Sequence, residues 1–476
     1  MVLARNNSVW RQFLTRLWGG CLVLLATSSL YAGVSEAQQQ RLGAELTPYG
    51  AERAGNDHEI PAWQGGLQPQ DWPKSYTHSG QHHPDPFADD EVLYTITAQN
   101  QHEYAGILTD GQRAMFAQYP ETFSIAVYPT RRSHSAPQWV YDNIYRNARS
   151  AQLTNDGNGI EHAYGGIPFP IPFDDKGEPN ALQMVWNHLA RFRGVHVVRE
   201  AAEVAVQQNG RYQLVDSVQD VAFNFYQPPT KDNTSAPDFN NVLFYYLSRT
   251  KSPARLAGNA RLIYEPLNQA VDPRQMWAFS SGQRRVRRAP HFEFDQPIAE
   301  ADGLRTADDT DMFNGSPERF DWFVIGKQEK LIPYNNYRLD DARLRYRTML
   351  TPNHVLPSLT RHELHRVWIV EARLKPGQRH IYKRRRFYID EDSWSIAMSD
   401  QYDLRDRLWR VSIAYLKNYY EVPTTWSALD VFHDLKAKRY HALFLDNEKP
   451  TTLQFSNEPV DLQYFSPHSL QRFRRP

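Results

Sequence analysis

The stretch LWRVSIAYL, residues 408–416, alternates bulky apolar side chains with polar or small ones. Its apolar series is Trp409, Val411, Ile413 and Tyr415. The stretch SWSIAMS, residues 393–399, has the same period, with the apolar series Trp394, Ile396 and Met398. Because successive side chains of a strand point to opposite faces, this period predicts antiparallel strands with one apolar face and one wet or lightly covered face.

Similar patterns on both sides of these stretches predict a meander from about residue 242 to 420. Further strands are expected at residues 92–98, 123–128, 242–248, 260–265, 275–280, 284–288, 321–326, 366–374 and 380–390. Asn209 and Gly210 form a hairpin signal between two more strands, and residues 180–193 have an apolar helical face that ends at Gly194. Strands and helices do not alternate regularly, so we expect a mainly β protein with some α-helix, built on one large, curved antiparallel sheet.

Residues 1–32 are predicted to be a cleaved export signal. Three arginines precede an apolar run at residues 17–26, and small and polar residues lead to a cleavage position after Ala32. The apolar run is about half the ~20 residues that a membrane-spanning helix needs. A lipoprotein signal is rejected at Cys21 because Trp18 stands where a lipobox has a small aliphatic residue. Cleavage removes the only cysteine, so we expect a periplasmic protein without disulfides or thiolate metal sites.

The rest of the chain is interpreted as an arm and one large domain. Ser35 and Gln38 have capping-box spacing, which predicts a short N-terminal helix. A turn-rich, aperiodic tract follows, and we interpret residues 33–90 as this helix plus an extended arm, with disorder as the alternative for residues 68–90. Residues 91–476 are expected to form a single large sheet domain.

Charge and motif content disfavour several functions. Lys plus Arg and Asp plus Glu both total 54, and this balance argues against nucleic-acid binding. The chain has neither a Gly-rich phosphate loop nor a G-x-S-x-G motif. His362 and His365 are three positions apart instead of the four of a zinc helix, so we interpret HELH as a polar turn edge. We therefore expect no enzyme activity, no catalytic residues, no cofactor and no metal site.

Two clusters of basic residues fall on predicted strands. Their members with a candidate role are Arg284, Arg285, Arg287, Arg288, Arg384 and Arg386. Alternate members point to opposite faces of a strand, so neither cluster is a single basic patch. One interpretation is a solvated face paired with nearby carboxylates. The other is a guanidinium row that binds anionic head groups or an acidic protein partner.

Several long motifs resemble a known family. They are LGAELTPYGAERAGN (42–56), IPAWQGGL (60–67), GGIPFPIP (165–172), DMFNGSPERFDW (311–322), IPYNNYRL (332–339), HELHRVWIVEA (362–372), KPGQRHIYKRRRFYIDEDSW (375–394) and LWRVS (408–412). The family is a large group of bacterial periplasmic proteins without a settled function, often labelled outer membrane lipoprotein-sorting protein. The resemblance covers nearly the whole chain after the predicted signal.

The resemblance implies the half-open antiparallel barrel of LolA and LolB, whose apolar concave face is covered by helices. It also implies a non-enzymatic carrier or accessory factor that binds lipid or another hydrophobic molecule in transit towards the outer membrane. Implied partners are an inner-membrane RND-class exporter or an outer-membrane protein. The residues expected on the apolar face are Trp277, Phe279, Trp322, Trp368, Trp394, Ile396, Trp409 and Ile413. The alternative function is an envelope scaffold or stress sensor that binds another envelope protein and no cargo.

Overall fold

A curved sheet of sixteen strands dominates the computed structural model, which describes residues 33–476 except 57, 230–238, 290–293, 459 and 475–476. In the order of the sheet, the strands are β1 (Tyr94–Ile96), β2 (Ile125–Val127), β12 (His362–Leu374), β13 (Arg384–Asp390), β14 (Ile396–Tyr402), β15 (Leu408–Tyr419), β16 (Thr424–Asp434), β17 (Arg439–Leu445), β5 (His196–Val206), β6 (Val215–Ala222), β7 (Val242–Ser252), β8 (Ala260–Pro266), β9 (Gln275–Ser280) and β10 (Arg285–Ala289). In addition, β11 (Phe320–Pro333) pairs with β12, and β18 (Gln454–Ser456) pairs with β5. The predicted signal peptide lies outside the described residues.

The helices are few and mostly short. The α-helices are α1 (Glu36–Gln39), α2 (Asp110–Gln118), α3 (Gln138–Ser150), α4 (Ala181–Ala190) and α5 (Tyr346–Met349). The 3-10 turns are η1 (Pro69–Asp71), η2 (Gln101–Tyr104), η3 (Ala307–Asp309), η4 (Pro317–Arg319), η5 (Tyr337–Asp340), η6 (Pro357–Leu359), η7 (Leu462–Phe465) and η8 (Ser469–Arg474). A separate two-stranded sheet joins β3 (Gln152–Leu153) and β4 (Ile160–Glu161). None of the described helices is long and apolar enough to cross a lipid bilayer.

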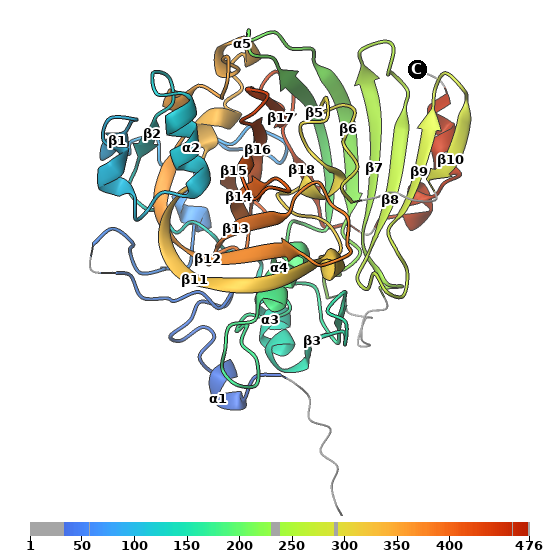
Figure 1. The fold of residues 1–476 in the computed structure, drawn as a ribbon. Coiled ribbons are helices and arrows are strands. Elements are labelled where there is room, and N and C mark those ends of the chain that lie inside the picture. The colour runs from blue at the N-terminus through green and yellow to red at the C-terminus, as the bar shows by residue number, and fades with distance from the viewer. Residues whose placement is uncertain (1–32, 57, 230–238, 290–293, 459, 475–476) are drawn as a thin grey trace, which may run out of the picture. The chain divides into compact units, whose positions relative to one another are not determined.

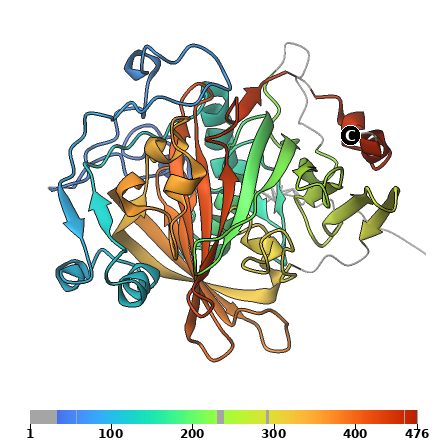
Figure 2. The same ribbon diagram turned by 90° about the horizontal axis from the view of Figure 1, so that it is seen from above.

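The sheet is open and bends strongly along its length. Its neighbouring strands run antiparallel, apart from the contact of β12 with β2, which is parallel. In Figure 1, β5–β8 stand upright while β11 and β12 run across the view. Figure 2 shows the red C-terminal strands beside the green strands β5 and β6, a neighbourhood made by the pairing of β17 with β5. The predicted fold class, mainly β with one large curved antiparallel sheet, is confirmed.

The main core lies between the C-terminal strands and the longer helices. Helices α3 and α4 pack into the same apolar cluster as β12–β17, through side chains that include Val140, Ile144, Met184 and Trp186. A second cluster joins α2 to β1, β2, β11 and β12. A third lies on β6–β9 and includes Phe465 and Leu470 from the C-terminal turns. These layers leave β14 and β16 buried along their whole lengths.

The prediction of a wet or lightly covered face on the alternating strands is wrong for residues 393–399 and 410–416, which are all buried. The polar partners Ser395, Ser399 and Ser412 are as deeply buried as the apolar series. They tolerate burial because they bond within the protein, as when the Ser412 hydroxyl donates to the side-chain oxygen of Gln401 at 2.7 Å. The strand expected at residues 393–399 begins later than predicted, at Ile396. Trp394 has a positive φ of 57° and belongs to the turn before the strand.

The interpretation of HELH as a polar turn edge is also wrong. Residues 362–365 are the first four of β12, and all four are buried. The Glu363 carboxylate accepts hydrogen bonds from Arg361 at 2.6 Å, Asn335 at 2.9 Å and the backbone N–H of Arg131 at 2.7 Å. This polar stretch can therefore be buried, because the Glu363 carboxylate has hydrogen-bond partners inside the protein.

Part of the N-terminal region, residues 33–90, packs against strands of the large sheet and the turns next to them. Ser35 and Gln38 form the expected capping box of α1. Farther along, Leu67 belongs to an apolar cluster with Tyr337 and Tyr420, against which Trp72, Tyr76 and Phe87 pack. His83, buried in the same stretch, lies 2.7 Å from the Glu421 carboxylate. Residues 67–87 thus contact the ends of β15 and η5.

Candidate ligand-binding pocket

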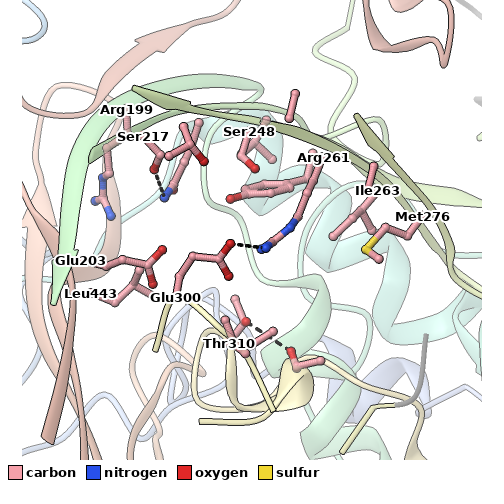
Figure 3. Close-up of a pocket in the computed structure, with 18 of the residues that line it drawn as sticks. Arg199, Glu203, Ser217, Ser248, Arg261, Ile263, Met276, Glu300, Thr310 and Leu443 are labelled. Carbon is pink, nitrogen blue, oxygen red and sulfur yellow. Dashed lines mark hydrogen bonds and ion pairs between the residues drawn. The ribbon is translucent and has the colours of Figure 1, made fainter. Parts of the chain in front are cut away.

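The inner faces of β5–β9 form one wall of a cavity of about 440 Å³ (Figure 3). Side chains alternate along each strand, so those that face the cavity are two positions apart. On β6 they are Val215, Ser217, Gln219 and Val221, and on β7 they are Phe244, Tyr246, Ser248 and Thr250. Residues 298–314, here termed the cover segment, bring Glu300 and Thr310 to the opposite side of the cavity.

Apolar side chains make up much of the cavity wall. They are Val197, Val215, Val221, Phe223, Phe244, Ile263, Met276, Trp426, Leu443, Phe444 and Leu453. Strands β16 and β17 contribute to this wall because the sheet order places them beside β5. The volume of this cavity, which is lined by both apolar and charged side chains, is within the range of sites for small molecules, about 300 to 1,000 Å³.

The carboxylates of the cavity are held in ion pairs. Glu265 lies 2.7 Å from Arg274, and Glu300 pairs with Arg261 at the position shown in Figure 3. Glu203 accepts a hydrogen bond from His441 at 3.0 Å and lies near Arg305. Burial raises the pKa of Glu203, but the His441 hydrogen bond and the nearby positive charges outweigh it and lower the pKa to about 2. Each of these carboxylates therefore has a basic partner inside the protein.

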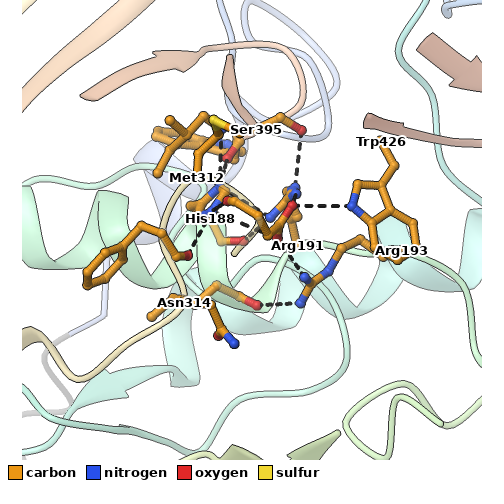
Figure 4. Close-up of polar contacts among 12 residues, drawn as sticks. His188, Arg191, Arg193, Met312, Asn314, Ser395 and Trp426 are labelled. Carbon is orange, nitrogen blue, oxygen red and sulfur yellow. Dashed lines mark hydrogen bonds and ion pairs between the residues drawn. The ribbon is translucent and has the colours of Figure 1, made fainter. Parts of the chain in front are cut away.

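Asp311 fixes the end of the cover segment to the end of α4. Its carboxylate oxygens lie 2.6 Å from Arg191 and 2.7 Å from Arg193, and Trp426 Nε1 donates to it at 3.2 Å. Figure 4 shows these two arginines and Trp426 converging around this point, with Ser395 bonded to Arg191. Burial raises the pKa of Asp311, but the charges of Arg191 and Arg193 outweigh it and hold the pKa well below its usual range.

The backbone at this anchor is in a conformation that side chains rarely adopt. Asp311 and Met312 have φ values of 55° and 64°, in the left-handed region. His188 of α4 is within hydrogen-bond distance of the Asp311 backbone oxygen at 2.9 Å, so the backbone is held as well as the carboxylate. Such conformations persist only where the surrounding contacts determine them.

A second anchor lies near the middle of the cover segment. Asp308 and Asp309 contact the two terminal nitrogens of Arg385 at 2.7 and 2.8 Å. Asp309 also accepts the hydroxyl of Tyr382 at 2.8 Å. Both carboxylates and Arg385 are buried, which gives the cover segment two charge-paired attachments to the main core.

Both anchors lie within the part of the chain that is similar to a known protein family. Residues 95–471 match a family described as Protein of unknown function (DUF1329). The chain belongs to the DUF1329 family. The motifs that predicted this membership include DMFNGSPERFDW, which holds Asp311, and KPGQRHIYKRRRFYIDEDSW, which holds Arg385. An uncharacterized protein of Pseudomonas aeruginosa is 45% identical over 449 residues, which cover 93% of this chain and 94% of that protein.

Solved structures with some similarity to this DUF1329 protein come from three other bacteria. A domain from Vibrio parahaemolyticus described as an outer membrane lipoprotein-sorting protein has a TM-score of 0.42 at 11% identity, covering 61% of this chain and 98% of that one. A DUF1329 protein of Desulfovibrio piger has a TM-score of 0.38 at 14% identity, covering 58% and 92%. A LolA superfamily protein of Nitrosomonas europaea has a TM-score of 0.33 at 10% identity, also covering 58% and 92%.

The eight aromatic and aliphatic residues predicted to contact a ligand are dispersed in this DUF1329 protein. Phe279 alone is among the described lining residues of the pocket, and it packs with Phe465 and Leu470 together with Trp277. The members in or against the main core are Trp322, Trp368, Trp394, Ile396 and Ile413. Trp409 donates to the Asp434 carboxylate at 2.9 Å near the end of the sheet strands. Ligand contact at these eight positions stays a prediction.

The two arginine clusters differ in their surroundings. Arg384 and Arg386 share the Glu371 carboxylate, at 3.2 and 2.9 Å, and Arg386 also reaches Asp110 at 2.9 Å. These contacts favour the interpretation of a sheet face paired with carboxylates. The cluster from Arg284 to Arg288 lies on β10 and in the turn before it, and Arg285 and Arg287 line the pocket.

Among the residues that the structure describes, two groups of side chains have ligand atoms close enough to share a metal ion. They are His365, Asp390 and Asp392, and His82, Asp340 and Asp446. In each group a basic side chain already binds a carboxylate: Arg132 lies 2.6 Å from Asp392, and Lys417 pairs with Asp340. Burial lowers the pKa of His365, but hydrogen bonds to Asp390 and Glu363 outweigh it and raise the pKa to about 9. These contacts favour charge pairing within the core.

Two buried aspartates of the sheet predict a pH-dependent stability. Burial, followed for Asp430 by the charge of Asp311, raises the pKa of Asp430 and of Asp400 to about 7, against an ordinary value of 3.8. The native state therefore holds these protons more tightly than the unfolded state does. Their stabilising contribution is complete below about pH 4 and is lost as the pH rises through about 7.

The change that isolates this effect is Asp400→Asn with Asp430→Asn, because asparagine resembles the protonated acid. At pH 4 the variant should unfold at nearly the same urea concentration as the wild type. At pH 8 the variant should be more stable than the wild type. The buried histidines are present in both proteins, so their titration does not affect the difference in stability. A variant whose relative stability is the same at both pH values would contradict the raised pKa of these two aspartates.

Proposed function

We propose that this DUF1329 protein is a periplasmic, non-enzymatic carrier or accessory factor that shields the apolar part of a lipid or another hydrophobic molecule in transit towards the outer membrane. The cavity between β5–β9 and the cover segment is the observation that supports this most strongly. The export signal predicted at residues 1–32 supports the compartment.

The energetics of such a site suit reversible carriage. Burial of about ten methylene groups contributes about 8 kcal/mol, at about 0.8 kcal/mol for each group. The loss of free motion on binding offsets part of this gain. The remaining affinity is high enough to keep the cargo bound in water. A partner whose apolar site binds the cargo more tightly can still remove it.

The charge pairing of the pocket supports carriage over hydrolysis. A hydrolase needs a general acid or base whose pKa lies near the working pH. Among the described lining residues, the four carboxylates Glu203, Glu265, Glu300 and Asp311 all form ion pairs with arginine. Such pairing occupies each of the four carboxylates with an arginine, so none of them faces the cavity as an unpaired acid or base.

A bound cargo can be sought in protein that is purified from the periplasm. The full-length protein is expressed in a Gram-negative host, released by osmotic shock and purified without detergent. Solvent extraction and mass spectrometry should then yield about one hydrophobic molecule for each protein chain. A second periplasmic protein purified in parallel controls for carry-over. If the two extracts are alike, the carrier proposal fails.

A second candidate function, an envelope scaffold, is favoured by one surface feature. Phe323 and Ile325 are 40% and 43% exposed on β11, which pairs on one side with β12. Exposed apolar side chains on a strand at the margin of a sheet are a common site of protein association. A scaffold would use this edge to bind an RND-class exporter or an outer-membrane protein.

Site-specific crosslinking separates the two candidates. A photoreactive amino acid at position 323 should form one discrete adduct with an envelope protein if the edge is an interface, and the same group at the exposed Val271 serves as control. Equal labelling patterns from the two positions would remove the scaffold candidate.

A further inference from the structure

Strand β10 brings two arginines to the margin of the pocket. The register pairs Arg285 with Ser280 and Arg287 with Ala278 of β9, and all four line the cavity. The other two arginines of the cluster lie elsewhere. Arg288 pairs with Trp277 and lies 5.7 Å from the centre of its ring, on the other face of the sheet, and Arg284 is in the turn with φ 51°.

Positive charge exceeds negative charge in the pocket. Its described lining includes seven arginines and four carboxylates: Arg193, Arg199, Arg261, Arg274, Arg285, Arg287 and Arg305, with Glu203, Glu265, Glu300 and Asp311. The four carboxylates are already paired. The side chains of Arg285 and Arg287 form no hydrogen bond or ion pair with any residue that the structure describes, and both residues are exposed. Their charge is therefore available to an external anion.

The opposite side of the pocket holds large apolar side chains, and its charged groups already have partners. Phe223, Phe244 and Leu443 lie on or beside β6, β7 and β17, on the far side of the sheet order from β10. Arg193 lies over the Phe223 ring but is paired with Asp311. Ile263 and Met276 of β8 and β9 lie between these apolar residues and the two arginines of β10. A molecule that spans this path meets large apolar side chains at one end and the exposed guanidinium groups of Arg285 and Arg287 at the other.

We propose that the pocket takes an anionic amphiphile, whose chain lies on the apolar wall and whose carboxylate or phosphate binds Arg285 and Arg287. This inference rests on the proposed carrier function and names its class of cargo. Guanidinium groups bind either anion through paired hydrogen bonds. The two positions are about 6.6 Å apart along the strand, a spacing that two long side chains bridge around one anionic group. Their exposure leaves the head group hydrated, which avoids the cost of burying its charge.

Three probes with the same sixteen-carbon chain test the inference: hexadecanol, palmitate and hexadecyl phosphate. Each is titrated below its aggregation concentration into the delipidated full protein. The wild type should bind at least one of the two anions about tenfold or more tightly than the alcohol, consistent with charge-assisted hydrogen bonds. The stronger of the two anions identifies the head group.

Two double variants locate the effect. Arg285→Gln with Arg287→Gln should lose the preference for the anion and keep the affinity for the alcohol. Arg284→Gln with Arg288→Gln removes the same charge from the same arginine cluster and should keep the preference. Equal binding of all three probes to the wild type, or a preference that survives in the first variant, overturns the inference and leaves carriage intact. Binding of none of the probes overturns the proposed function itself.

Discussion

Asp311→Asn is expected to lower the free energy of unfolding by about 3–5 kcal/mol, the usual cost of breaking a buried ion pair from one side. The substitution removes the charge that neutralises Arg191 and Arg193, whose side chains are 2% and 6% exposed. Two guanidinium groups then remain buried without a counter-charge. Urea denaturation followed by far-UV circular dichroism measures the loss.

The matched control for this prediction is Asp341→Asn. Asp341 also pairs with an arginine, but Arg343 is 90% exposed, and such surface pairs contribute little to stability. We therefore expect a clear difference between the two variants. If Asp311→Asn unfolds at the same urea concentration as Asp341→Asn, the cover segment is not held in the way described.

Ser248→Trp is expected to weaken binding of any chain-like ligand by a factor of about 100 or more, because an indole group would fill the space that about three or four methylene groups need. Ser248 lies on β7 and points into the cavity in Figure 3. The added side chain occupies empty volume, so the fold should persist. A titration with the tightest of the three amphiphiles measures the effect.

Ser248→Ala separates the added volume from the lost hydroxyl. This variant should bind the amphiphile as the wild type does, and both variants should retain the wild-type circular dichroism spectrum. Should Ser248→Trp fold normally and bind with unchanged affinity, the ligand site lies elsewhere on the protein.

The sheet could be predicted largely because several of its strands follow simple rules. From residue 242 to 288, strands and turns succeed one another closely, and clean alternation marks the strands expected at residues 393–399 and 408–416. Strands β16 and β17 were missed, since β16 carries polar residues such as Ser427 and Asp430 among its buried positions. Helix α3 was missed because its polar residue Asn147 is buried, where it bonds to the backbone oxygens of Tyr164 and Ile167.

The pocket could be predicted only in part, for a physical reason. The largest aromatic side chains gain most from full burial, so Trp394 and its neighbours fill the core instead of lining an open space. The pocket wall combines small residues such as Ser217 and Ser248 with other aromatic residues such as Phe223 and Phe244. Its composition depends on the pairing of β5 with β17, strands more than 200 residues apart, which no local pattern reveals. The alternation of β10 did allow Arg285 and Arg287 to be separated from Arg288.

The position of a bound chain tests the central claim most directly. Crystals of the protein grown with a fatty acid that carries bromine on its last carbon would locate that atom by anomalous scattering. We predict bromine inside the cavity, in van der Waals contact with Phe223 and Phe244, at about 4 Å. Bromine found only on the outer surface, with the cavity closed by the protein's own side chains, would contradict the claim.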